Sequence, residues 1–192
     1  GIVASASTTS LSTAGESMSN TRILNNTVTG GYYGIRLNGA SATPSAGNTI
    51  SNNNVRDFYY YGMYLYYMDS TLVENNNISR PTRATLSTTG YGMYLYYSQK
   101  MKLNANKIHN PNGVSSTSVT FYGIYTIGDA MQGRENLITN NLLYNFNAKG
   151  TIYAIYNSGA DGVYYYHNTV VLDDPTSTST SLARGFYQTT AA

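Results

Sequence analysis

Acidic residues and histidines are the side chains best suited to acid–base chemistry, and they are few and dispersed in this chain. Asp173 and Asp174 form the only adjacent carboxylate pair, the grouping that glycoside hydrolysis requires, but they precede Pro175 in a Thr- and Ser-rich segment. His109 and His167 are the only histidines, and neither lies in a catalytic motif. The sequence therefore provides no catalytic residues and favours a protein without enzyme activity in this segment.

Metal chemistry is also poorly supported. A calcium site gathers several carboxylate and carbonyl oxygens, whereas the other candidate carboxylates are scattered over different parts of the chain. They are Asp57, Asp69, Asp129, Glu135 and Asp161. The chain contains no cysteine, which excludes a thiolate metal site and a disulfide framework. We expect no metal and no cofactor.

Tyrosine is the most regular candidate for molecular contact. The chain has 21 tyrosines and no tryptophan, and the segment Tyr61–Tyr67 (YGMYLYY) recurs unchanged at Tyr91–Tyr97. A phenol ring combines an apolar body with a hydrogen-bonding tip, so a regular row of such rings suits sugar stacking or packing against another protein. The elements that would hold these rings follow from the repeat itself.

A repeat anchored on glycine extends along the whole chain. Each anchor is followed by an apolar residue. The anchors are Gly1, Gly34, Gly62, Gly92, Gly123, Ala154 and Gly185. Subtracting neighbouring positions gives intervals of 28 to 33 residues. A period of this length is typical of a solenoid, in which each repeat packs on the next.

Asparagine occupies a second fixed position in the repeat. An apolar or aromatic residue lies three positions before each of these asparagines, and an apolar residue lies two positions after it. The asparagines are Asn26, Asn53, Asn76, Asn106, Asn141 and Asn168. Each period therefore contains three short strand-like pieces, with the asparagine at the bend between the second and third.

Strands fit these pieces better than helices, because each piece is only about four or five residues long and alternates in character. The pattern resembles the right-handed parallel β-helix, the fold of pectate-lyase-like proteins, and the asparagine column resembles the internal asparagine ladder of that family. We predict that residues 1–192 form a single all-β solenoid of about six coils, with three short strands per coil. Coils stack about 4.8 Å apart, so each asparagine amide would donate to the asparagine of the next coil, while the asparagine itself tolerates the left-handed conformation.

The tyrosines that follow the anchors divide by strand alternation. Residues two positions after each anchor are predicted to point outward, where they would contact a ligand or partner. They are Arg36, Tyr64, Tyr94, Tyr125, Tyr156 and Tyr187. Tyr61 and Tyr91, which precede the anchors, are predicted to face inward or to lie at a bend. The alternative for the outward row is purely structural, since stacked tyrosines also stabilise neighbouring strands.

Composition excludes two classes of function. The net charge of +2 and the dispersed Lys and Arg residues cannot form the basic face of a nucleic-acid binder. No apolar run approaches the roughly 20 residues that span a bilayer. Charged residues make up only 10% of the chain, so uncharged polar side chains must form most of its surface.

These features favour an extracellular structural or adhesive module, and they allow a self-associating fibre subunit. Tyr-, Asn- and Thr-rich repeats resemble secreted or surface β-helix proteins of Bacteroidota, which implies a bacterial, cell-surface location. Open coil edges are templates for pairing, so we expect a segment of a longer solenoid or end-to-end stacking of molecules. The alternative is a carbohydrate-active protein, either a polysaccharide lyase-like enzyme or a glycan-binding module, with a glycan as partner.

Overall fold

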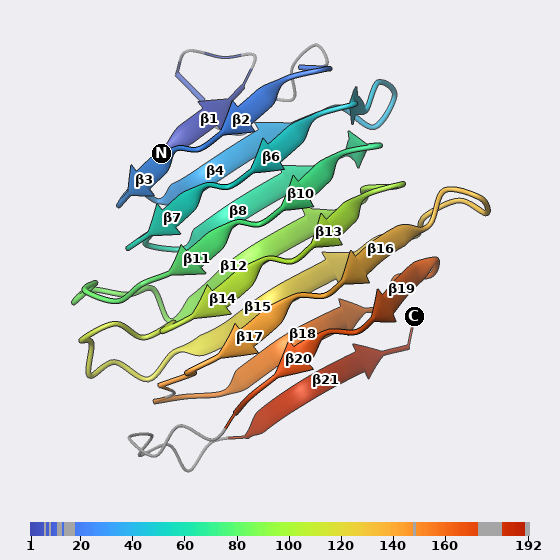
Figure 1. Ribbon diagram of the computed structural model, residues 1–192. Coiled ribbons are helices and arrows are strands. Elements are labelled where there is room, and N and C mark those ends of the chain that lie inside the picture. The colour runs from blue at the N-terminus through green and yellow to red at the C-terminus, as the bar shows by residue number, and fades with distance from the viewer. Residues whose placement is uncertain are drawn as a thin grey trace.

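The computed structural model describes residues 1–5, 7, 9–10, 13, 18–147, 149–172 and 182–190, and these residues form a parallel β-solenoid. Asp173 and Asp174 lie outside the described residues. Three sheets run the length of the molecule, and every coil contributes one strand to each of them. In Figure 1 the two sheets of short strands lie in front of the sheet of long strands.

The long-stranded sheet, here called sheet A, contains seven strands. They are β1 (Ile2–Ala4), β4 (Tyr33–Asn38), β8 (Tyr61–Tyr66), β12 (Thr89–Tyr96), β15 (Thr120–Ile127), β18 (Ile152–Ser158) and β21 (Ala183–Thr189). Neighbouring strands are parallel and in register with the repeat, so that Tyr94 pairs with Tyr64 on one side and Tyr125 on the other.

Sheets B and C are each six-stranded. Sheet B contains β2 (Arg22–Leu24), β6 (Thr49–Ser51), β10 (Leu72–Glu74), β13 (Lys102–Asn104), β16 (Asn136–Thr139) and β19 (Val163–Tyr166). Sheet C contains β3 (Thr27–Thr29), β7 (Asn54–Arg56), β11 (Asn77–Ser79), β14 (Lys107–His109), β17 (Leu142–Tyr144) and β20 (Thr169–Val170). A small fourth sheet pairs β5 (Ser45–Ala46) with β9 (Met68–Asp69). Among the described residues, none belongs to a helix that could cross a bilayer.

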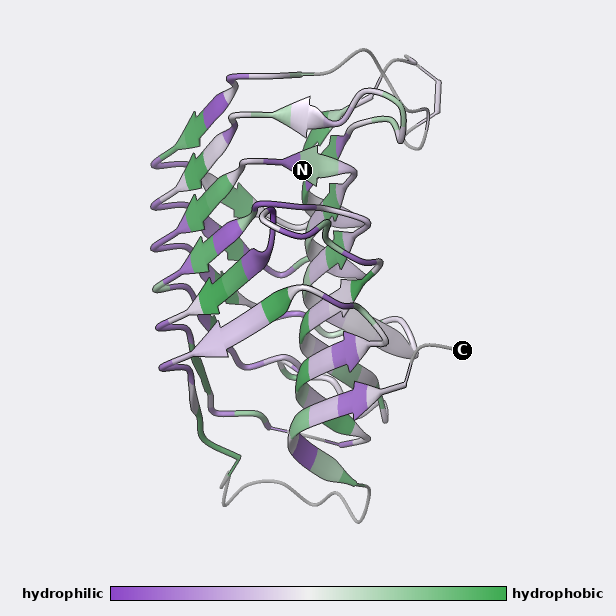
Figure 2. Cartoon of the chain, turned by 90° about the vertical axis from the view of Figure 1, so that its right-hand side faces the viewer, coloured by the Kyte–Doolittle hydropathy of each residue, from purple (hydrophilic) through white to green (hydrophobic). Residues whose placement is uncertain are grey.

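The core is a narrow aliphatic interior enclosed by the three sheets (Figure 2). Sheet A supplies two inward columns, represented in the central coil by Met93 and Leu95, and sheets B and C supply one each, represented by Leu103 and Ile108. All four residues are 2% exposed or less. Each fully buried aliphatic side chain stabilises the fold by roughly 1.5–3 kcal/mol. The internal coils repeat this contribution, whereas Phe186 of the last coil is 49% exposed.

The predicted asparagine ladder is confirmed at the bend between sheets B and C. The Asn106 amide donates to Asn141 Oδ1 at 3.0 Å and to the Val73 carbonyl at 2.9 Å. Asn106 Oδ1 in turn accepts from the amide and from the backbone N–H of Asn76. One detail of the prediction was wrong: the left-handed residue is the one before each ladder asparagine, because the ladder side chain must point inward to bond across coils.

Two of the longer connections, residues 80–88 and 110–119, lie at the corner between sheets C and A. Arg80 from the first of these is fully buried, with its guanidinium 5.3 Å from the Phe58 ring centre and 5.0 Å from that of Phe121. Its Nη1 donates to the Tyr59 carbonyl, whereas Nε and Nη2 have no partner among the described residues. Burial, together with repulsion from nearby Arg83, lowers the pKa of Arg80 to about 9.

Candidate functional site: the tyrosine face of sheet A

The outer surface of sheet A is an array of stacked phenol rings, here called the tyrosine face. Its first column contains Tyr33, Tyr61, Tyr91, Tyr122 and Tyr153, and its second contains Tyr64, Tyr94, Tyr125, Tyr156 and Tyr187. All ten side chains are partly exposed. The outward orientation predicted for the second column therefore agrees with the structure, although contact with a ligand or partner stays a prediction.

Of the two alternatives predicted for Tyr61 and Tyr91, the inward one was wrong, since both lie on the outer face beside the second column, next to a bend. The reason is a kink at each anchor glycine, where strand alternation breaks and two successive residues, such as Gly62 and Met63, face inward. A Cβ on Gly62 would lie 2.5 Å from the Gly92 carbonyl oxygen and 2.7 Å from Ile78 of sheet C. Glycine thus allows sheet A to bend closely over sheet C, and the bend returns the preceding tyrosine to the outside.

Rings within a column are nearly parallel, and the two columns are nearly perpendicular to each other. Tyr94 lies 4.7 Å from Tyr125 at an interplanar angle of 8°, whereas Tyr91 lies 4.9 Å from Tyr94 at 85°. Ring planes in van der Waals contact lie about 3.5 Å apart, which is less than the distance between ring centres in a column. The rings of each column must therefore be tilted, so that they stack with an offset. The two columns tilt in opposite senses, which makes them perpendicular.

This packing decides which part of each phenol is available. The next rung covers the faces of every internal ring. Side chains stand roughly perpendicular to a sheet, so the hydroxyl is the outermost atom of each ring. The tyrosine face therefore presents hydroxyls and ring edges rather than open aromatic faces.

Arginines close both ends of the array. The Arg36 guanidinium lies 4.5 Å from the Tyr33 ring centre and 4.7 Å from that of Tyr64. At the other end, Arg184 lies 5.1 Å from Tyr153 and 4.9 Å from Tyr187. Each cation covers ring faces that would otherwise be open, an arrangement typical of cation–π contacts.

The expectation that Arg36 is an exposed contact residue was wrong. Its side chain is 5% exposed, and its Nε donates to Asn38 Oδ1 at 2.9 Å. The neighbouring aromatic rings and this hydrogen bond hold the guanidinium against the sheet. Arg36 therefore ends the array instead of extending its contact surface.

The tyrosine face remains uncharged well above neutral pH. Burial by the neighbouring rings raises the pKa of Tyr64 and of Tyr122 to about 12. Burial also raises the pKa of Tyr61, Tyr91 and Tyr94, and repulsion from adjacent phenolates adds to the effect. A charged partner would therefore find no counter-charge among the phenols of this surface.

Two of the acidic residues considered for metal binding, Asp57 and Asp69, have separate structural partners. The Asp57 carboxylate, although burial opposes its charge, accepts hydrogen bonds from Thr82 and Arg56 that lower its pKa. Asp69 pairs with Arg134. Within the part of the chain that the structure describes, no three His, Asp or Glu side chains form a group able to hold a metal ion.

Comparison with known proteins agrees with this geometry. A family model described as "Right handed beta helix region" matches residues 9–173. The chain belongs to the right-handed beta helix family. No curated protein and no solved structure matches it. The family fixes the fold of this beta helix, while its function has to be argued from the tyrosine face.

Sequence reasoning missed two parts of this site. The first column was assigned to the interior because alternation was assumed to continue through the anchor. The recurrence of glycine itself was the available signal, because a residue without Cβ at every turn indicates close backbone approach. The second omission was Arg184, whose position in the first column mirrors that of Arg36 in the second.

Proposed function

We propose that this beta helix is an extracellular structural or adhesive module that contacts its partner through the tyrosine face. The observation that carries the proposal is the continuous, uncharged array of ring edges and hydroxyls along sheet A. Large exposed patches with apolar character are typical of interaction sites on otherwise soluble domains. A bacterial cell-surface location is part of the same proposal.

The stacking favours one kind of contact over another. Sugar stacking needs an open aromatic face, and the faces here are covered by other rings or by arginine. Rows of hydroxyls about one coil step apart suit a partner that is itself flat and repetitive and that accepts hydrogen bonds. A second copy of the solenoid fits this description, and we propose lateral or end-to-end self-association as its structural role.

The edge at β21 fits a further parallel coil, whether that coil belongs to a longer chain or to a second molecule. On its outer side β21 has no strand partner among the described residues, and Phe186 of this last coil is 49% exposed. Phe186 and Tyr165 line an open depression at that edge together with Ile155. A further parallel coil placed there would cover apolar surface and satisfy backbone groups, which is the usual hazard and use of an open strand edge.

A carbohydrate-active protein is the second candidate. The hydroxyl rows are the observation that favours it, because a linear glycan running along the solenoid axis could bond to successive rungs. This contact would use hydroxyl hydrogen bonds rather than ring stacking, so it would be a binding function. A lyase-like activity would need catalytic groups that the tyrosine face does not supply.

The double variant Tyr94→Phe/Tyr125→Phe tests the proposal. It removes two hydroxyls and keeps both rings, so the stacking survives. Two lost hydrogen bonds of about 0.5–1.5 kcal/mol each should weaken the contact roughly tenfold. The matched control is Tyr164→Phe/Tyr166→Phe, which removes two exposed hydroxyls from sheet B, away from the tyrosine face.

Sedimentation velocity over a concentration series measures self-association, and pull-down on insoluble polysaccharides measures glycan binding. Weakening by the sheet A variant alone supports the tyrosine face as the contact surface, and the assay that responds identifies the partner. Equal behaviour of both variants and the unmodified chain in both assays would refute it. Electron micrographs of short, uniform rods at high concentration would refute the end-to-end mode.

A further inference from the structure

A second, independent feature lies on the opposite side of the molecule, at the bend between sheets B and C. One residue at this bend has a positive φ, between 54° and 58°, in each of the six coils. These residues are Asn25, Asn52, Asn75, Ala105, Asn140 and His167. Five of the six are asparagine or histidine, which tolerate the left-handed conformation better than other side chains do. Ala105 is the exception, and its backbone is strained without a polar side chain to offset the strain.

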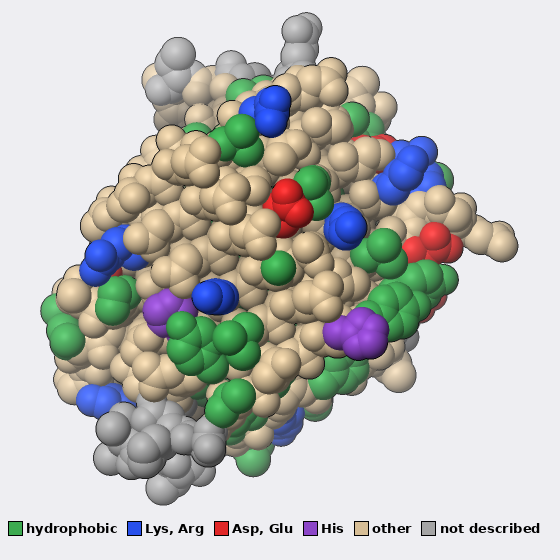
Figure 3. Space-filling model, viewed as in Figure 1, with side chains coloured by type: hydrophobic (Ala, Val, Ile, Leu, Met, Phe, Trp, Pro, Cys, Tyr) green, Lys and Arg blue, Asp and Glu red, His purple; other side chains and the backbone are tan. Residues whose placement is uncertain are grey.

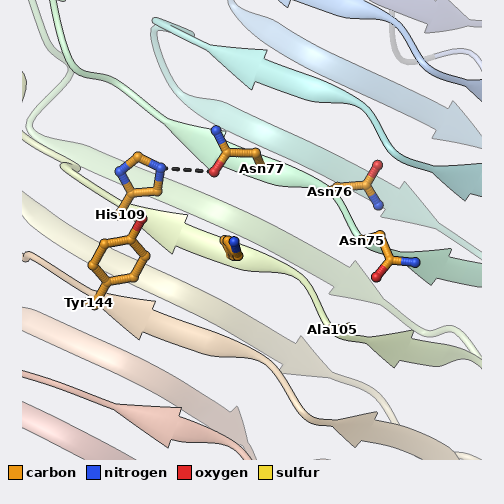
Figure 4. Close-up of a pocket in the computed structure, with 7 residues that line it drawn as sticks. Asn75, Asn76, Asn77, Ala105, His109 and Tyr144 are labelled. Carbon is orange, nitrogen blue, oxygen red and sulfur yellow. Dashed lines mark hydrogen bonds between the residues drawn. The ribbon is translucent and has the colours of Figure 1, made fainter.

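A depression of about 500 Å³ extends from this bend over the adjoining part of sheet C. Ala105 forms its floor where the coils on either side carry Asn75 and Asn140. The side chains of Asn77, Lys107, His109 and Tyr144 complete the wall, all from sheet C (Figure 4). Figure 3 shows the same face, on which a histidine and a basic side chain lie beside a hydrophobic patch. The volume is within the range of small-molecule pockets.

The imidazole of His109 is held in a fixed position. Its ring stacks on Tyr144 at 4.9 Å, and its Nε2 lies 2.8 Å from Asn77 Oδ1. The Asn77 amide donates to Asn54 Oδ1, which orients its oxygen toward the imidazole, so Nε2 must be the donor. Nδ1 faces another amide oxygen, that of Asn110. Both ring nitrogens of His109 therefore have partners within the protein.

The lining supplies a positive charge. Lys107 is exposed and contributes an ammonium group. None of the lining residues is acidic. Asn75 adds an exposed amide that can donate to or accept from a hydroxyl. A cationic donor beside neutral amides suits a ligand that carries both an oxyanion and hydroxyl groups.

We propose that the gap at Ala105 is a binding site for the oxyanion group of a small polar ligand, such as a sulfated sugar. Lys107 pairs with the oxyanion, Asn75 bonds to neighbouring hydroxyls, and the fixed His109–Tyr144 pair forms the wall. The site uses no residue of the tyrosine face and does not depend on the function proposed for it. An asparagine at position 105 would place its amide in the part of the depression where the ligand is proposed to bind.

Proton NMR of the imidazole signals tests the proposal directly, because the chain has only two histidines. Titration with glucose 6-sulfate should shift the His109 signals in a saturable manner. His167 occupies the bend position that is equivalent to Ala105, two coils away, and serves as the internal reference. Saturable shifts at His109 alone support the site, whereas no shift, or equal shifts at both histidines, would overturn it.

Variants of the lining residues and comparison ligands make the test specific. Lys107→Gln should weaken binding at least tenfold, while Lys102→Gln, an exposed lysine on β13 outside the depression, should not change it. Ala105→Asn should abolish binding while the urea midpoint stays equal or rises, which separates loss of the site from misfolding. Retained binding in Ala105→Asn would overturn the proposal.

Glucose and inorganic sulfate are the two comparison ligands for glucose 6-sulfate. Glucose binding as tightly as its 6-sulfate would refute the role of the oxyanion. Inorganic sulfate that competes with glucose 6-sulfate supports the oxyanion site. Equal affinity for inorganic sulfate and glucose 6-sulfate would show that the site recognises the oxyanion alone. Weaker binding of inorganic sulfate would show that the sugar hydroxyls also contribute to recognition.

Discussion

Removal of one internal rung of the asparagine ladder should destabilise the solenoid strongly. Asn106 is fully buried, and its side chain makes four hydrogen bonds: two accepted from Asn76 and one donated each to Val73 and Asn141. Asn106→Ala removes all four and leaves the buried backbone N–H of Asn76 without its acceptor. At about 0.5–1.5 kcal/mol for each hydrogen bond, the expected loss is about 2–6 kcal/mol in the free energy of unfolding.

The same substitution at the end of the ladder provides the control. Asn26 is exposed and donates to Leu24 and Asn53, with no side-chain acceptor role to a preceding coil among the described residues. Water can replace its lost bonds, so Asn26→Ala should cost less than about 1 kcal/mol. The two variants change the same atoms, and the difference between them isolates burial within the ladder.

Urea denaturation followed by circular dichroism and tyrosine fluorescence measures both costs. A loss of this size is large beside the 5–15 kcal/mol that typical domains possess, so the midpoint should fall clearly. Repeat proteins can unfold in parts, and agreement between the two probes tests whether the whole solenoid unfolds together. Equal costs for Asn106→Ala and Asn26→Ala, or a cost below about 1 kcal/mol for Asn106→Ala, would refute the reasoning.

Three further outcomes follow from the structure. Ala105→Asn should raise stability by about 0.5–1 kcal/mol, because asparagine tolerates the left-handed backbone, and a lower urea midpoint would contradict this. Arg80→Met replaces a buried cation that has no carboxylate partner among the described residues with an apolar chain, so it should be neutral or stabilising by about 1–4 kcal/mol. A clearly lower midpoint of thermal unfolding would show that the guanidinium is needed. The folded pKa of Tyr64 and Tyr122, about 12, exceeds the unfolded value near 10, so their contribution to stability is complete below pH 10 and is lost between about pH 10 and 12. Phenolate absorbance measured against pH checks this, and tyrosines that all titrate near pH 10 would contradict it.

The repeat was sufficient to predict the architecture. A period of 28 to 33 residues requires equivalent positions to stack one coil apart, so the apolar columns, the three strands per coil and the asparagine ladder could all be predicted from spacing. The ladder is the clearest case, because a buried amide with identical neighbours above and below has its partners fixed by translation alone. No knowledge of side-chain direction was needed for that prediction.

Side-chain direction at irregular positions could be decided only by tertiary structure. Tyr61 and Tyr91 face outward because the backbone bends at Gly62 and Gly92 to pack against sheet C, and the alternation rule does not hold through such a bend. Arg36 is buried because aromatic rings of its own and the next coil surround it.

The depression at Ala105 depends likewise on several coils at once. Its lining comes from β11, β14, β17 and the bends that precede β11 and β14, and only stacking brings these segments together around the one bend that lacks a polar side chain. The sequence by itself determined which residues share a column, because residues that are one repeat apart in a solenoid stack directly on one another. Tertiary structure decided which columns face the solvent and where the surface is hollowed, because those properties depend on backbone bends and on contacts between neighbouring coils.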